Sequence, residues 1–115
     1  MKTSELTGAQ LDWAVAECEG ELDECDYHLN EYTGAFMLDH GELSAAYCPS
    51  TLWNHGGPII ERGGIGFRKE AKSSWRAFKG GESDNYMTRS GSTPLIAAMR
   101  TYVASKLGDE VDVPF

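Results

Sequence analysis

The sequence has no hydrophobic run long enough to cross a membrane. Its apolar residues are dispersed among polar ones, whereas a spanning helix needs about 20 consecutive apolar residues. The residues that follow Met1 are polar, unlike the apolar segment of a secretory signal. We therefore expect a cytoplasmic protein that does not contact membranes. A chain of 115 residues has room for one modest core, so we predict a single domain over residues 1–115.

Recognisable metal-binding and disulfide patterns are also missing. The three cysteines match neither a disulfide framework nor the paired C-x-x-C of zinc sites, and the three histidines form no H-E-x-x-H pair. We expect reduced thiols, no metal site and no cofactor. The residues concerned are Cys18, Cys25, Cys48, His28, His40 and His55.

Basic residues are scarce in the first part of the chain. Residues 1–42 hold eleven acids and one base, Lys2, whereas residues 43–115 hold seven acids and nine bases, for a net charge of −8. Duplex nucleic acid requires a basic face, so an acidic lobe argues against that partner. The basic part could still bind a small anion. The four carboxylates within residues 21–26 do not fit the calcium loop of an EF-hand, and we interpret them as a solvated acidic surface.

Two helices are predicted, one near each end of the chain. Residues 4–22 carry apolar side chains at three- and four-residue steps, as an amphipathic helix does. The second helix has Thr93 as its N-cap, Pro94 at its first position, a wide apolar stripe over residues 95–107 and Gly108 as its stop.

Between the helices, short runs of alternating character predict antiparallel strands. We predict an α+β fold: a small antiparallel sheet of about five strands with an N-terminal and a C-terminal helix. The polar, glycine-flanked segment at about 80–91 is predicted to be a mobile loop. The expected strands are 32–38, 43–47, 58–61, 65–68 and 75–78.

The stretch 47–61 has the composition of a fixed, irregular loop. Pro49 and Pro58 restrict the backbone, the pair Gly56-Gly57 permits positive φ, and Trp53 can anchor the loop to a core. Loops held in this way often carry function.

No catalytic signature accompanies this loop. Nucleophilic catalysis needs a thiol or hydroxyl with a base and an orienting group, and Cys48 with His55 is the one pair worth considering. No family-type flanking sequence supports that pair. We therefore expect a protein that is not an enzyme.

A site for a small ligand is the better prediction for this loop and the strands after it. Aromatic faces can stack on a base, hydroxyl and amide groups can bond its edge or a ribose, and arginines can bind phosphate. The alternative is that the aromatics belong to the core, the hydroxyls satisfy the loop backbone and the arginines are solvated. The candidate ligand-binding residues are Tyr47, Ser50, Thr51, Trp53, Asn54, His55, Arg62, Arg68, Trp75 and Arg76.

Two blocks of sequence resemble a known family. Residues 47–61, with Pro-Ser-Thr, Trp and Gly-Gly-Pro-Ile-Ile-Glu, and residues 92–113, with Thr-Pro-Leu-Ile-Ala-Ala-Met-Arg, closely resemble the NinX-like proteins of lambdoid phages and enterobacterial prophages. The opening residues 1–16 fit that family too. This resemblance implies a small accessory product of the phage early region that works in the host bacterial cytoplasm, and it implies no particular reaction.

A second similarity concerns architecture. The predicted helix, compact sheet and Ser-x-x-aromatic loop at residues 50–53 are similar to those of small phage proteins that form oligomers and sequester the cyclic nucleotide or cyclic ADP-ribose signals of bacterial immunity. This similarity implies a homo-oligomer that binds a small phosphorylated nucleotide signal without catalysis, as a counter-defence sponge. The alternative is an inhibitor whose acidic residues 17–31 bind a host nuclease or immune effector.

Overall fold

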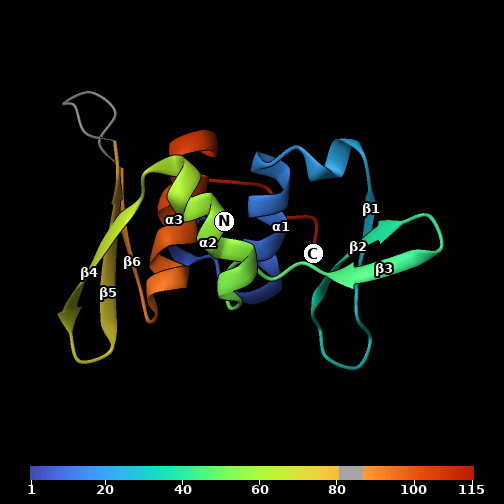
Figure 1. The fold of residues 1–115 in the computed structure, drawn as a ribbon, viewed down its shortest axis with the longest axis horizontal. Helices are drawn as coiled ribbons and strands as arrows, with labels where there is room; N and C mark the ends of the chain where they lie inside the picture. The colour runs from blue at the N-terminus through green and yellow to red at the C-terminus, as the bar shows by residue number, and fades with distance from the viewer. Residues whose placement is uncertain (81–86) are drawn as a thin grey trace.

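The computed structural model describes residues 1–80 and 87–115. Three helices form the centre of the molecule, and the two sheets lie at opposite ends of its longest axis (Figure 1). The helices are α1 (Gly8–Cys18), α2 (Trp53–Gly63) and α3 (Pro94–Leu107), with short 3₁₀ turns η1 (Thr3–Glu5) and η2 (Glu21–Asp23). The strands are β1 (Asp26–Leu29), β2 (Phe36–His40), β3 (Leu43–Ala46), β4 (Gly66–Ala71), β5 (Ser74–Lys79) and β6 (Met87–Gly91).

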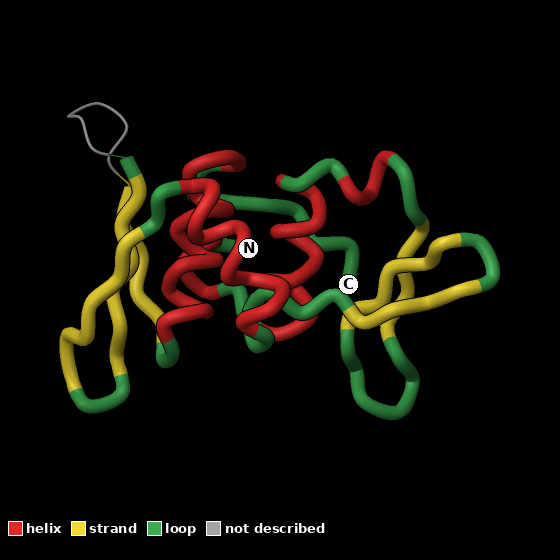
Figure 2. The backbone as a smooth tube through the Cα atoms, viewed as in Figure 1, coloured by secondary structure: helices red, strands yellow, loops and turns green. Residues whose placement is uncertain are grey.

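The predicted α+β class is confirmed, but the single sheet of about five strands is wrong. The described strands form two antiparallel three-stranded sheets, ordered β1-β2-β3 and β4-β5-β6. Helix α2 comes between β3 and β4 in the chain and so separates the two sheets, as the tube in Figure 2 shows. The molecule is consequently elongated, with extents of 44 × 30 × 26 Å.

Helix α3 is the centre of the main core, and its predicted boundaries are confirmed. Thr93 Oγ1 accepts a hydrogen bond from the Ile96 N–H at 3.1 Å, Pro94 occupies the first turn and Gly108 ends the helix. Its stripe packs against β5 and β6 on one side and α1 on another. Each large buried side chain contributes roughly 1.5–3 kcal/mol. The α3 residues buried in the main core are Ala97, Ala98, Met99, Tyr102 and Val103.

The N-terminal helix is shorter than predicted. The regular part, α1, ends at Cys18, and Gly20 then takes a left-handed conformation with φ of 77°. The chain continues through η2 into β1, a strand that the acidic composition of this region did not predict. The predicted strand 43–47 is confirmed as β3, and the predicted strand 32–38 is displaced, because residues 32–35 lie outside β2. The two strands pair as a hairpin with Gly41 at φ of 68° in the turn.

The stretch 47–61 is only partly a loop, and this is the largest correction. Residues 47–52 are irregular, but Trp53–Gly63 form α2, so the predicted strand at 58–61 is wrong. Gly56 and Gly57 are helical rather than at positive φ. Gly56 instead lets the backbone of α2 approach the loop closely, because a Cβ at this position would lie 2.5 Å from the Pro49 carbonyl oxygen. Burial of Ile59, which is 3% exposed, outweighs the helix-breaking tendency of Pro58.

The predicted strands at 65–68 and 75–78 are confirmed as β4 and β5, each somewhat longer than expected. The predicted mobile loop at 80–91 is wrong for residues 87–91, because they form β6 and pair with β5. Residues 81–86 of that loop lie outside the described residues.

Candidate functional site

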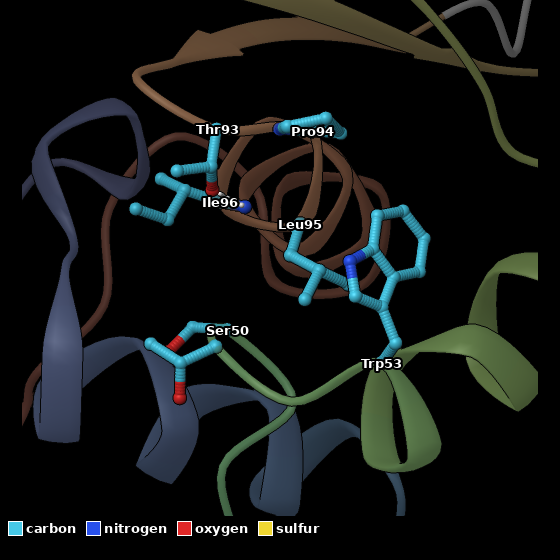
Figure 3. A pocket seen from close by; sticks show the side chains of 7 residues that line it. Ser50, Trp53, Thr93, Pro94, Leu95 and Ile96 are labelled. Atoms are coloured by element: carbon cyan, nitrogen blue, oxygen red, sulfur yellow. Dashed lines mark hydrogen bonds between the residues drawn. The ribbon is translucent and has the colours of Figure 1, made fainter.

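A cavity of about 210 Å³ lies where the loop before α2 meets the first turn of α3 (Figure 3). It brings together three of the predicted ligand-binding residues, Ser50, Thr51 and Trp53, with four residues about 40 positions later in the chain. These four are Thr93, Pro94, Leu95 and Ile96.

The loop that forms one wall of the cavity is fixed by two side chains from helices. The Ser50 N–H donates to Asp12 Oδ1 of α1 at 2.9 Å, and the Cys48 N–H donates to His55 Nδ1 of α2 at 2.9 Å. Pro49, between these two anchors, is fully buried. The wall is therefore held in place before any ligand arrives.

Asp12 is an unusual anchor because it is an acidic residue that is only 4% exposed. Burial raises the pKa of Asp12 from 3.8 to about 6, although interaction with the Ser50 hydroxyl and the Ser50 N–H acts in the opposite direction. Ser50 itself is 1% exposed, so its hydroxyl is buried near the Asp12 carboxyl rather than open to the cavity.

Trp53 forms the opposite wall and leaves 52% of its surface exposed. Figure 3 shows its indole ring beside Leu95 at the edge of the cavity. The Trp53 and Phe67 ring centroids are 5.9 Å apart, and those of Phe67 and Trp75 are 6.1 Å apart. Lys69 Nζ lies 5.9 Å from the Trp75 ring centroid. A row of aromatic rings thus leads from the cavity to a cation on β4.

The first turn of α3 offers few free donors to the cavity. Pro94 has no N–H, the Ile96 N–H bonds to Thr93 Oγ1, and the Ala97 N–H bonds to the Thr93 carbonyl at 3.0 Å. A helix start normally attracts phosphate through such N–H groups. Because the threonine cap uses them here, the cavity suits a flat, partly apolar group better than a phosphate.

The three predicted phosphate-binding arginines do not reach the cavity. Arg62 makes an ion pair with Glu19 at 2.6 Å, on the surface between α2 and α1. Arg76 pairs with Glu70, and Arg68 is exposed directly across from Arg76 in the β4–β5 register.

The other predicted residues have structural roles or stand apart. Tyr47 is half-buried and stacks on His55, with centroids 5.9 Å apart and planes at 19°, so that face of each ring is already covered. Burial raises the pKa of Tyr47. Asn54 is exposed on α2 and does not line the cavity.

Cys48 and His55 do not resemble an activated nucleophile and its base. Burial and the nearby Asp12 raise the pKa of the Cys48 thiol, whereas a nucleophilic cysteine needs a lowered one. His55 Nδ1 already accepts the Cys48 N–H. The hydrogen bond between these two residues holds the loop against α2.

Sequence reasoning identified the start of α3 but did not place it in the site. Nothing in one sequence shows that Thr93 and Leu95 lie beside Ser50. The weak signal was the Thr93-Pro94 cap, because a helix start is a common place for polar ligands. Asp12 was missed because a single acid on an amphipathic helix reads as solvated.

Neither a metal-binding cluster nor a membrane-spanning helix occurs in the described residues. Within residues 1–80 and 87–115, no three side chains of the metal-ligating types lie together. In the same part of the chain, no helix combines the length and the apolar character that crossing a membrane requires.

Comparison with known proteins identifies the family. The family model described as "Bacteriophage P22, NinX" matches residues 2–106, which is nearly the whole chain. No curated protein matches the sequence significantly. The matched region includes α1, the cavity loop, Trp53 and almost all of α3. The chain therefore belongs to the NinX family of bacteriophage P22.

Proposed function

We propose that this NinX-family protein binds and sequesters a small nucleotide signal, without converting it, and that the base enters the cavity beside Trp53. The observation that carries this proposal is one cavity that combines a half-exposed tryptophan, Trp53, with a fixed loop on which Thr51 is an exposed hydroxyl residue. In a phage protein, such sequestration would lower the free concentration of an immune signal in the host.

The size and walls of the cavity favour one base rather than a whole nucleotide. Drug-sized ligands occupy about 300–1,000 Å³, so a cavity of about 210 Å³ fits a single ring system. Stacking of a base on an aromatic side chain contributes about 1–3 kcal/mol. Trp53 offers such a face, and Phe67 packs against its ring in a tilted arrangement.

Polar recognition would come from the loop and the cap rather than from arginine. The exposed Thr51 can bond the edge of a base, and its backbone is fixed by the hydrogen bond between Ser50 and Asp12 and by the turn in which the Thr51 N–H donates to the Cys48 carbonyl at 3.1 Å. The ribose and phosphate would then extend along the aromatic row toward Lys69.

Titration calorimetry with a panel of cyclic and linear nucleotides tests the proposal. We expect one ligand class to bind the wild type, and Trp53→Ala to weaken that binding about 5- to 150-fold, the equivalent of a lost stacking contact. Leu52→Ala is the matched control. Leu52 is the neighbouring residue, is also exposed and does not line the cavity. Equal affinities of the two variants, or no binding by the wild type, would contradict the proposal.

The acidic sheet supports a second candidate function. Residues 20–46 contain seven acids and neither lysine nor arginine, and they form the lobe with β1, β2 and β3. Such a surface suits a basic host protein such as a nuclease or an immune effector. Replacing all four acids within residues 21–26 by their amides should abolish that binding and spare nucleotide binding, the reverse of Trp53→Ala.

A further inference from the structure

Each of the two sheets has an exposed edge strand. In the β1-β2-β3 sheet, β3 is an edge strand in which all four residues are exposed, and Leu43 leaves 75% of its surface exposed. In the β4-β5-β6 sheet, β4 is an edge strand whose residues Arg68–Ala71 are exposed. The backbone of an uncovered edge is a template for pairing with another strand.

The register of β3 shows which of its backbone groups are free. The Tyr47 N–H donates to the Phe36 carbonyl at 3.0 Å, immediately beyond the paired residues Met37 and Ala46. Hydrogen-bonded pairs alternate along an antiparallel ladder. The N–H groups of Ser44 and Ala46 therefore point away from β2, toward the open edge.

The charges of the two sheets with their connections are opposite, although β3 itself has no charged residue. Residues 20–46 carry seven acids and no lysine or arginine. The described residues of the other sheet and its connections, 66–80 and 87–91, carry six lysines and arginines and one acid, Glu70. Two β3 edges or two β4 edges would bring like charges together, whereas β3 and β4 attract each other.

We propose that the free edge of β3 pairs with the free edge of β4 of a second copy of this chain, which joins the two sheets into one that continues across copies. The sheets lie at opposite ends of a molecule 44 Å long, so the contact forms between molecules (Figure 1). It is heterologous, because each copy uses a different edge on each side, and it builds a ring or an open chain. The cavity beside Trp53 takes no part in the contact, so this inference does not rest on the proposed function.

The strength of the contact follows from its size and charge. β3 has four residues, so one edge contact is short, and assembly requires high protein concentration. Because the charges are exposed, salt screens their attraction over distances of about 8–10 Å at physiological ionic strength. Assembly should therefore grow with protein concentration and shrink with added salt.

Light scattering coupled to size-exclusion chromatography tests the contact with two edge-blocked variants. Ala46→Pro removes an outward N–H from β3, at the kind of edge position where proline is tolerated. The double variant Arg68→Glu, Lys69→Glu reverses the charge of β4. We expect the wild type at high concentration and low salt to have at least about twice the monomer mass. Each variant alone should be a monomer, whereas an equimolar mixture should form a pair, because each retains one working edge.

Controls make every outcome decisive. Leu43→Lys, which places a cation on the exposed β3 edge opposite the basic β4, replaces Ala46→Pro if the proline variant fails to fold as judged by circular dichroism. The double variant Lys2→Glu, Lys106→Glu changes the net charge equally at exposed positions outside both edges, and it should still assemble. A wild type that stays monomeric in low salt, an edge variant that assembles alone, or a mixture that does not associate would overturn the proposal.

Discussion

Asp12 illustrates how one side chain can link the core to the candidate site. Its side chain extends from α1 and accepts a hydrogen bond from the Ser50 N–H at 2.9 Å. Burial of the carboxyl group makes its negative charge unfavourable. Most surface acids stabilise a protein when they are ionised. Asp12 does the opposite, because its folded-state pKa of about 6 lies above the value of 3.8 of a free carboxyl group.

The pH dependence of stability follows from this difference. Between about pH 4 and 6 the folded state retains the Asp12 proton more firmly than the unfolded state, so the contribution of Asp12 to stability falls as pH rises through that range. The full effect is roughly 3 kcal/mol. We predict that Asp12→Asn, whose amide oxygen can still accept the Ser50 N–H, is more stable than the wild type at pH 7 and gains little at pH 4. Urea unfolding at both pH values measures this, and parallel pH profiles of the two proteins would refute it.

Two neighbouring glycines give a second prediction at the same scale. A Cβ at Gly56 would lie 2.5 Å from the Pro49 oxygen and 2.7 Å from Leu95 Cδ2, whereas one at Gly57 would meet nothing within 4 Å. We expect Gly56→Ala to destabilise the fold by about 1–3 kcal/mol through overpacking. Gly57→Ala should stay within about 1 kcal/mol of the wild type, because a gain in helix propensity opposes the restriction before Pro58. Thermal unfolding distinguishes the two, and equal melting temperatures would show that α2 does not pack tightly on the loop.

At the scale of elements, the sequence predicted those whose local and tertiary signals agree. Helix α3 has a cap, a proline at its start, an apolar stripe and a glycine stop, and all four indicate one boundary. Strands β4 and β5 lie where short runs of alternating residue types predict them, although their burial does not alternate along the chain. Helix α2 was mispredicted because Gly56, Gly57 and Pro58 disfavour a helix locally, and the packing that overrides them is not visible in the sequence.

The cap of α3 gives a prediction for this element. Thr93 Oγ1 bonds the Ile96 N–H, so Thr93→Ala should reduce stability by about 0.5–2 kcal/mol, and Thr93→Ser should restore most of it. Chemical denaturation of the three proteins measures the series. Because Thr93 also lines the cavity, the serine variant, which keeps the hydroxyl and the cap, shows whether the missing methyl group alone affects ligand binding. An alanine variant as stable as the wild type would mean that the cap contributes nothing.

At the same scale, the sequence predicted the loop side of the candidate site but not the side formed by α3. The loop residues Ser50, Thr51 and Trp53 share the cavity because they are adjacent in sequence. The arginines were assigned to the site by residue type alone, and ion pairs with Glu19 and Glu70 hold two of them elsewhere. Pairing of distant segments decides such contacts, and a single sequence carries no record of it.

The whole molecule separates its charges as well as its sheets. The acidic sheet and the basic sheet lie at opposite ends of the helical centre, and the cavity opens between α2 and α3 in the middle. Ligand binding and contacts of the acidic sheet can therefore be disrupted independently. Substitutions within residues 21–26 and at Trp53 should have additive effects on stability, because distant sites without shared partners usually do.

The central claim is that the cavity beside Trp53 holds a nucleotide. The most direct measurement is mass spectrometry of the small molecules released by heat from protein purified out of bacteria that produce cyclic nucleotide or cyclic ADP-ribose signals. We predict a nucleotide in stoichiometric amount from the wild type and from Leu52→Ala, and its loss from Trp53→Ala. Protein that releases no nucleotide, and whose melting temperature no nucleotide raises, would contradict the account.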